Sequence, residues 1–218
     1  MAVIALLVLS TGSAAAATGP RGDATFTQNG KSADAGSRGC VSNGDGTSTC
    51  SDVGISVFVG KMSDNVSGVT HVNQVCVFLD AYTYTDATGE LVSEYVTENG
   101  CRVDLPIRTL QVGSGLTSVT LAPTTVSIQR LFCDGTFTCV PGLSRDVTVA
   151  GTWTGVGPIS YSKYRSVSDD GTCRYDEAAK GHSRQASFSG TVDRQSLSVD
   201  YASITDGKST YRSRCSEV

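Results

Sequence analysis

Few residues of this chain have both the type and the spacing that catalysis requires. Ser160-Tyr161-Ser162-Lys163 satisfies the S-x-x-K pattern and Ser63-Asp64-Asn65 satisfies S-D-N, two signatures of serine acyl-transfer sites. The two motifs occur in reversed order, and the K-T-G motif that completes the set is absent from the sequence. Ser160 and Lys163 also lie in a strand-like run, where positions three apart point to opposite faces of a sheet. The sequence therefore predicts no serine nucleophile here.

The remaining candidates for acid–base chemistry are two histidines and two pairs of acidic residues. A Ser-His-Asp site needs only one histidine, but the sequence around His71 and His182 marks neither as a base. Asp169-Asp170 and Asp176-Glu177 would suit a glycosidase only if the fold placed two carboxyl groups at a defined separation across a cleft. We predict no catalytic residue and no cofactor, and we keep a secreted hydrolase of polysaccharide or protein as the main alternative.

The cysteines carry the clearest chemical signal. Their number is even, and no two are separated by only two residues, as a zinc site of the C-x₂-C type would require. We therefore predict disulfides and no metal site. Disulfides persist in oxidising compartments, so the pattern favours a secreted, extracellular protein. The eight cysteines are Cys40, Cys50, Cys76, Cys101, Cys133, Cys139, Cys173 and Cys215.

One disulfide follows from the register of a predicted hairpin. The segment between Cys76 and Cys101 reads as strand, turn and strand. If the turn is centred between Thr88 and Gly89, the two cysteines face each other within disulfide distance.

The other cysteines pair by local turn signals and by elimination. Turn residues lie between Cys40 and Cys50 and between Cys133 and Cys139, so we expect each of these pairs to form a disulfide. Cys173 and Cys215 then remain as the last pair. An internal repeat, described below, would instead join Cys101 to Cys133; we prefer the hairpin register because it rests on local geometry. The predicted pairs are Cys40–Cys50, Cys133–Cys139 and Cys173–Cys215.

The same hairpin register lines up aromatic side chains. Tyr82 faces Tyr95, and Tyr84 lies two residues along on the same side, with Asp80 and Thr97 making that face polar. A row of rings can stack on sugar rings or other flat apolar ligands while the hydroxyl groups supply hydrogen bonds, so we predict Tyr82, Tyr84 and Tyr95 as ligand-binding residues. The simpler interpretation is that this row packs as core. The opposite face could supply the buried side instead, since it carries Val77, Leu79, Ala81, Val92 and Val96, interrupted by Glu94 and Glu98.

Composition excludes several classes of protein. The chain has 218 residues, and its 17 basic and 21 acidic residues leave a net charge of −4, which supplies no electrostatic reason to bind nucleic acid. No run of apolar residues is long enough to span a membrane. Many β-branched residues and few helix formers disfavour a helical bundle.

Strand-like runs separated by turn signals recur along the chain, and no segment shows a convincing helical period. The one helix candidate, Asp176–Lys180, is short enough to be a turn. We predict an all-β, antiparallel, sandwich- or barrel-like fold of about ten to twelve strands, in two internally related, disulfide-linked units packed together. The clearest runs are Val53–Lys61, Leu116–Leu121, Val126–Phe132, Asp146–Trp153, Ile159–Val167, Ala186–Val192 and Ser196–Tyr201.

The chain divides into four predicted segments. Residues 1–17 resemble a signal peptide, because an apolar run precedes small residues ending in Ala-x-Ala, although no basic residue comes first. Residues 18–38 read as a polar N-terminal tail. Three short matches recur in the same order and suggest a duplication, with β unit 1 over 39–133 and β unit 2 over 134–218. The matches pair Asp45–Cys50 with Asp134–Cys139, Cys101–Asp104 with Cys173–Asp176, and Ser127–Cys133 with Ser209–Cys215.

These observations together predict a secreted, disulfide-stabilised β-protein that acts as a non-catalytic binding or structural module. Its partner would be an extracellular carbohydrate or protein surface, and neither nucleic acid nor a membrane span is expected. A protease inhibitor is a third hypothesis, because Cys139–Arg145 looks like an exposed segment tethered beside a disulfide.

Overall fold

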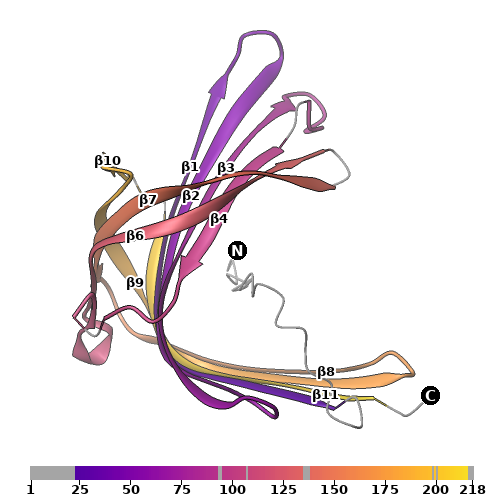
Figure 1. Ribbon diagram of the computed structural model, residues 1–218, viewed down its shortest axis with the longest axis vertical. Helices are drawn as coiled ribbons and strands as arrows, with labels where there is room; N and C mark the ends of the chain where they lie inside the picture. Colours follow the sequence, from indigo (N-terminus) through magenta and orange to yellow (C-terminus); the bar gives the residue numbers. More distant parts are fainter. Residues whose placement is uncertain are drawn as a thin grey trace.

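A computed structural model shows eleven strands in one antiparallel sheet, and this confirms the all-β prediction (Figure 1). The structure describes residues 23–92, 95–106, 108–134, 138–197, 199 and 201–215. The predicted signal peptide lies outside these residues. The elements are β1 (Ala24–Ser42), β2 (Thr47–Asp64), β3 (Gly68–Thr85), β4 (Tyr95–Arg102), β5 (Leu110–Val112), the 3₁₀ turn η1 (Ser114–Leu116), β6 (Ser118–Cys133), β7 (Cys139–Gly155), β8 (Ser160–Asp169), β9 (Cys173–Val192), β10 (Gln195–Ser196) and β11 (Tyr201–Cys215).

The sheet closes on itself as a barrel-like ring. β1 lies between β2 and β11, and β7 pairs with both β6 and β9, so eight strands form a closed circuit. Ala24 of β1 faces Ser213 of β11, which makes the first and last described strands neighbours. Among the described residues, the short strands β5 and β10 and the longer β8 each pair with a single strand. None of the helical segments among the described residues is long and apolar enough to cross a membrane.

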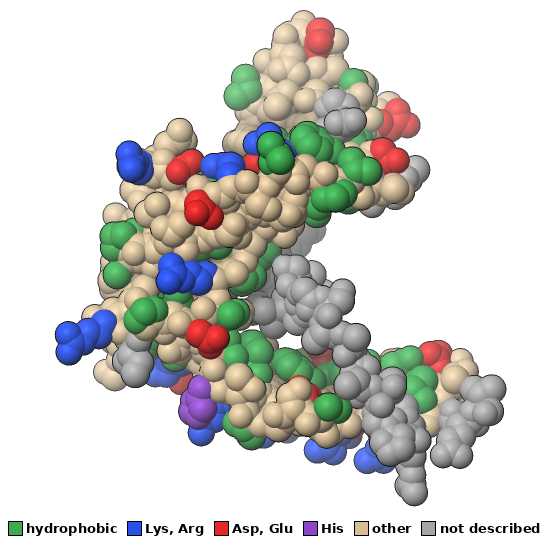
Figure 2. Space-filling model, in the orientation of Figure 1, with side chains coloured by type: hydrophobic (Ala, Val, Ile, Leu, Met, Phe, Trp, Pro, Cys, Tyr) green, Lys and Arg blue, Asp and Glu red, His purple; other side chains and the backbone are tan. Residues whose placement is uncertain are grey.

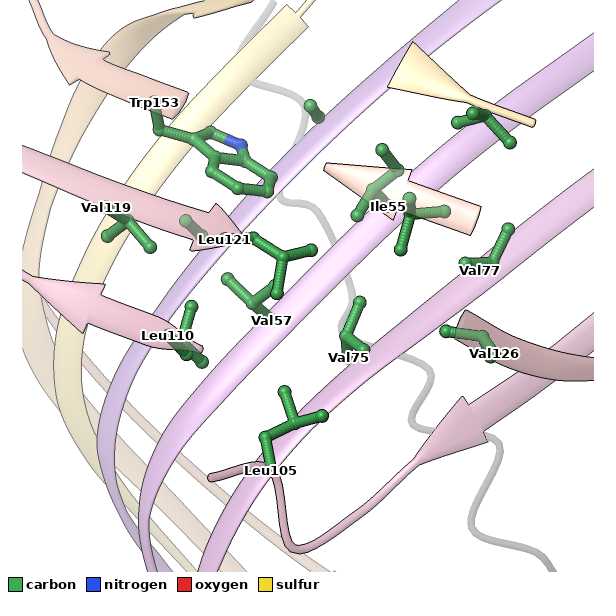
Figure 3. Packing of buried hydrophobic residues seen from close by; sticks show 14 of the residues in the cluster. Ile55, Val57, Val75, Val77, Leu105, Leu110, Val119, Leu121, Val126 and Trp153 are labelled. Carbon is green, nitrogen blue, oxygen red and sulfur yellow. The ribbon is translucent and has the colours of Figure 1, made fainter. Parts of the chain in front are cut away.

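The ring encloses the hydrophobic core. Alternate residues of β1, β2 and β3 point inward, and Ala33, Val57 and Val75 are at most 1% exposed. Trp153 of β7 is fully buried within this cluster (Figure 3). It packs edge-on against Phe188, with ring centroids 4.7 Å apart. Removing such side chains from water is the main stabilising contribution of the ring.

The long strands continue past the ring as two single-layer arms (Figure 1). The upper arm contains the ends of the β1–β2, β3–β4 and β6–β7 hairpins. The lower arm contains β8, the β2–β3 hairpin and the adjoining parts of β1, β9 and β11. Because an arm is one sheet thick, both of its faces lie outside the core, and successive residues alternate between them.

The structure differs from the sequence-based expectation in three places. Residues 24–38, expected to be a polar tail, instead form most of β1, which pairs with β2 and β11 and buries Ala33 and Ala35 in the ring. Asp176–Lys180 is not helical but lies within β9, where pairing on both sides overrides local propensity. Ser196–Tyr201 is not a continuous strand, because β10 ends at Ser196 and β11 begins at Tyr201.

Four glycines form a row at the base of the lower arm, just beyond the buried row that contains Ala33. Gly181, Gly207, Gly30 and Gly60 face one another in turn on β9, β11, β1 and β2. A Cβ added to Gly30 would lie 2.7 Å from the Gly60 Cα and would also collide with the Val59 carbonyl oxygen. The strands approach too closely at this point for any larger residue.

All four predicted disulfides are present, and the described residues contain no free cysteine. Cys76 and Cys101 are directly opposite in the β3–β4 ladder, so the register argument is confirmed and the alternative Cys101–Cys133 bridge is wrong. The two predicted units share one sheet, since β6 pairs with β7 and β1 pairs with β11. The duplication itself stays a prediction.

Candidate binding face on the upper arm

The predicted aromatic side chains lie together on one face of the upper arm. Along β3 the residues alternate, so that Val75 and Val77 face the core while Phe78, Tyr82 and Tyr84 point to the other side. Tyr95 of β4 joins them across the hairpin. We call the surface formed by Phe78, Asp80, Tyr82, Tyr84 and Tyr95 the aromatic face.

The aromatic row is not part of the buried core cluster. Val77 on the opposite face is fully buried, and Leu79 packs against the core cluster, whereas the three tyrosines are only partly buried. On the aliphatic face, Val77 and Leu79 contribute to the core, whereas Ala81 and Val92 are exposed. Glu94 lies outside the described residues.

The tyrosines form a continuous aromatic contact. The ring centroids of Tyr82 and Tyr95 are 5.9 Å apart with an interplanar angle of 57°, and those of Tyr82 and Tyr84 are 6.4 Å apart at 36°. These separations are in the range in which aromatic rings attract one another. The rings therefore hold one another in place across the hairpin.

Two disulfides flank the tyrosines in one row that crosses six strands. Cys50 faces Tyr82 on one side, and Tyr95 faces Cys133 on the other. The flanking disulfides join β1 to β2 and β6 to β7, and the Cys76–Cys101 disulfide joins β3 to β4, the two strands that carry the tyrosines. The row runs, from β1 to β7, through Cys40, Cys50, Tyr82, Tyr95, Cys133 and Cys139.

The next row supplies charged and polar groups. Arg38 donates two hydrogen bonds to the Asp52 carboxylate, at 2.7 and 2.8 Å, and Asp52 faces Asp80 across the β2–β3 ladder. Burial and a hydrogen bond to Asp80 raise the pKa of Tyr95 to about 12. Burial, followed by the charge of Asp52, also raises the pKa of Tyr82. Both phenols therefore remain protonated at neutral pH and can donate hydrogen bonds.

Sequence reasoning missed the Arg38–Asp52 pair, although a signal for it was present. The Cys40–Cys50 bridge places the two cysteines opposite each other, and two residues further from the turn the same register places Arg38 opposite Asp52.

A second missed feature is a charge network on the opposite face of the same arm. Glu98 of β4 is only 6% exposed and interrupts the aliphatic face. Its carboxylate accepts hydrogen bonds from Arg130 Nε at 2.6 Å and from Arg145 Nη2 at 2.6 Å. Arg145 also donates to Asp193 at 3.0 Å. These hydrogen bonds, with that of Arg145 first, lower the pKa of Glu98.

The residues considered for catalysis are not brought together. His71 and His182 both lie in strands of the lower arm, and His182 stacks on Tyr161 with centroids 5.2 Å apart. Within the described part of the chain, no side-chain hydrogen bond or ion pair joins either histidine to a serine or a carboxylate. The described residues also contain no cluster of His, Cys, Asp and Glu able to hold a metal ion.

The segment that suggested a protease inhibitor is part of a paired strand. Residues 139–145 form the start of β7 and pair with β6, with an irregularity between Gln129 and Leu131. Leu143 is 88% exposed beside this irregularity. The projecting loop that an inhibitor would require is therefore not present at 140–145.

Comparison with known proteins adds no assignment. No protein-family model matches the chain, and a search of the curated proteins finds no similar sequence. Four disulfides in an all-β fold are compatible with an extracellular protein.

Proposed function

We propose that this protein is a secreted, non-catalytic binding module that holds a carbohydrate on its aromatic face. The observation that carries the proposal is the row in which Tyr82 and Tyr95 stand side by side between two disulfides. Sugar rings have apolar C–H faces that pack against aromatic rings, and their hydroxyl groups need hydrogen-bond partners around the edge. The aromatic face supplies both kinds of contact.

The polar groups around the rings suit a hydroxyl-rich ligand. The phenol groups can donate hydrogen bonds to a ligand. The Asp80 carboxylate already accepts a hydrogen bond from Tyr95 and can accept another from a ligand hydroxyl group. The Arg38–Asp52 pair borders the same surface and is held by two hydrogen bonds. Because the disulfides already restrain the strands, little additional ordering should accompany binding, which favours affinity.

Replacing Tyr82 with Ala tests the proposal. Binding to a panel of insoluble polysaccharides (cellulose, chitin and starch) should identify a retained glycan, and Tyr82→Ala should weaken that binding about tenfold or more, as loss of a central aromatic contact does. The melting temperature should change little, because the ring is outside the core. Tyr164→Ala is the matched control, since Tyr164 is 50% exposed on β8, away from the aromatic face. Unchanged binding by Tyr82→Ala, or a large fall in its melting temperature, would contradict the proposal.

One arrangement favours the hydrolase alternative. Asp52 and Asp80 face each other between the Arg38 guanidinium and the tyrosines, and a pair of carboxyl groups is the basic requirement of glycoside hydrolysis. Release of reducing ends from the retained glycan, abolished by Asp80→Asn, would support this alternative over pure binding. For a binding module we expect no release by the unaltered protein.

A further inference from the structure

The lower arm gathers every lysine of the chain on one face. The sequence contains only five lysines, one each in β1, β2, β8, β9 and β11. The strand register places all five on the face that continues the inward side of the ring, together with both histidines. Figure 2 shows basic and histidine side chains along the lower edge of this arm. The five residues are Lys31, Lys61, Lys163, Lys180 and Lys208.

Four of the lysines belong to one row. Directly facing residues on six strands form this row, and all six are exposed. With neighbouring strands about 4.8 Å apart, the row is roughly 24 Å long. From β3 to β8 its members are His71, Lys61, Asn29, Lys208, Lys180 and Lys163. We call it the lysine row.

The surface around the lysine row is also basic. Four arginines share this face further out along the arm, so that nine basic side chains stand against three acidic ones at the paired positions. We call this surface the basic face, and its charge contrasts with the net charge of −4 for the whole chain. The arginines are Arg165, Arg174, Arg212 and Arg214, and the acids are Asp169, Asp176 and Asp206.

The positive charge of the lysine row is not neutralised by ion pairs among the described residues. Like charges directly opposite on neighbouring strands destabilise a sheet, yet Lys208 faces Lys180, which faces Lys163. None of the ion pairs among the described residues involves a lysine. The one ion pair that the described residues form on the basic face joins Arg165 Nη2 to Asp176 Oδ2 at 2.8 Å. A row of exposed, unpaired cations that costs stability is explained most simply by an anionic partner.

A shallow hollow opens beside the lysine row where the strands approach at the glycines. Gly30 and Gly60 contribute backbone to it, and cationic and amide side chains surround it. Such a hollow can hold one anionic group of a longer ligand. The side chains that line it are those of Asn29, Lys31, Val59, Lys61, His71, Asn73 and Asp206.

We propose that the basic face binds a linear anionic polysaccharide, bearing carboxylate or sulfate groups, that lies across the strands along the lysine row. Single-stranded nucleic acid is less suited, because its binding sites stack successive bases on several aromatic rings, whereas the only aromatic ring in the lysine row is the His71 imidazole. A bilayer surface is also less suited, since the row has no apolar side chain to enter the headgroup region. The four disulfides agree with a partner found outside the cytosol. This surface is separate from the aromatic face and does not depend on the function proposed for it.

The test compares two triple variants with the same change in net charge. Lys163, Lys180 and Lys208, all replaced by Gln, remove three adjacent cations of the row. Arg102, Arg108 and Arg194, all replaced by Gln, remove three exposed cations elsewhere. The probe is dextran sulfate, with uncharged dextran as its control, and binding is measured by calorimetry at several salt concentrations. Circular dichroism melting checks that each variant is folded.

The unaltered protein should bind dextran sulfate and not dextran, with an affinity that falls as salt rises. The lysine variant should bind at least about tenfold more weakly and with a smaller salt dependence, because fewer counterions are displaced, whereas the arginine variant should bind nearly as well as the unaltered protein. Equal losses in both variants, or undiminished binding by the lysine variant, would overturn the proposal. Tighter binding to oligothymidylate or to phosphatidylglycerol vesicles than to dextran sulfate would overturn the choice of polysaccharide. Because Tyr82 is intact in both variants, these results are independent of the test of the aromatic face.

Discussion

Glu98 is the residue whose charge matters most to the upper arm. It is a nearly buried carboxylate, and the two arginines that neutralise it come from β6 and β7. The three strands are thereby joined by side chains as well as by backbone hydrogen bonds. Each arginine is about two-fifths exposed, so water shares part of its charge and limits what the network contributes.

Replacing Glu98 with Gln should lower the free energy of unfolding at pH 7 by about 1–2 kcal/mol, because charge-assisted hydrogen bonds are lost while the arginines remain partly solvated. The arginines lower the pKa of Glu98 in the folded protein, so its stabilisation is present above the unfolded-state pKa and is lost as pH falls through the folded value. Denaturant unfolding between pH 7 and 3 should therefore show a steeper acid loss in the unaltered protein than in Glu98→Gln. The exposed Glu177→Gln should follow the unaltered protein, and equal acid slopes for all three would contradict this assignment.

At the scale of elements, the glycine row determines how closely the strands of the lower arm can approach. A side chain at Gly30 would meet backbone atoms of β2, which cannot move aside without disturbing the ladder. Gly39, also in β1, offers a comparison, because a Cβ there would find only the Ser51 hydroxyl, 3.8 Å away.

Gly30→Ala should destabilise the protein by about 1–3 kcal/mol, the usual cost of overpacking. Gly39→Ala should be neutral or stabilise by up to about 1 kcal/mol, because it only restricts the unfolded chain. Paired denaturant titrations measure both. A Gly30→Ala variant as stable as Gly39→Ala would show that the strands can separate at the glycine row without penalty.

Local elements were predictable from the sequence, and their assembly was not. The register of the β3–β4 hairpin follows from one turn and two cysteines, so Cys76–Cys101 and the neighbouring tyrosines could be placed from the sequence alone. The strand at 24–38 was missed because Ser, Thr and Gly on both faces of an arm leave no alternation of apolar and polar residues to recognise. The lysines stand far apart in the sequence, and only the pairing of β8, β9, β11, β1 and β2 aligns them.

For the whole molecule, the disulfides should contribute according to the length of chain each one closes. Cys76–Cys101 joins residues 25 apart and Cys133–Cys139 joins residues 6 apart, and each bridge combines one buried with one exposed cysteine. The two pairs are thus closely matched except in loop length.

Replacing both cysteines of the longer loop with Ser should cost about 3.5 kcal/mol, compared with about 2 kcal/mol for the shorter loop, if restriction of the unfolded chain is the main effect. Guanidinium unfolding of the two double variants measures this difference. An equal or larger cost for Cys133–Cys139 would mean that the bridges act mainly through the folded structure.

The pairing of β1 with β11 has a consequence for the order in which the chain can fold. The hairpins β1–β2, β3–β4 and β6–β7 join segments close in sequence and can form early. The seam between Ala24 and Ser213 joins the two ends of the described chain, so the ring cannot be completed until the final strand is available. Pairing two strands that are this far apart in the sequence costs loop-closure entropy before any stabilising contacts form, and this slows folding. Until the seam closes, β1 and β11 each present an unpaired edge to other chains, and this is the stage at which the protein is most exposed to misassembly.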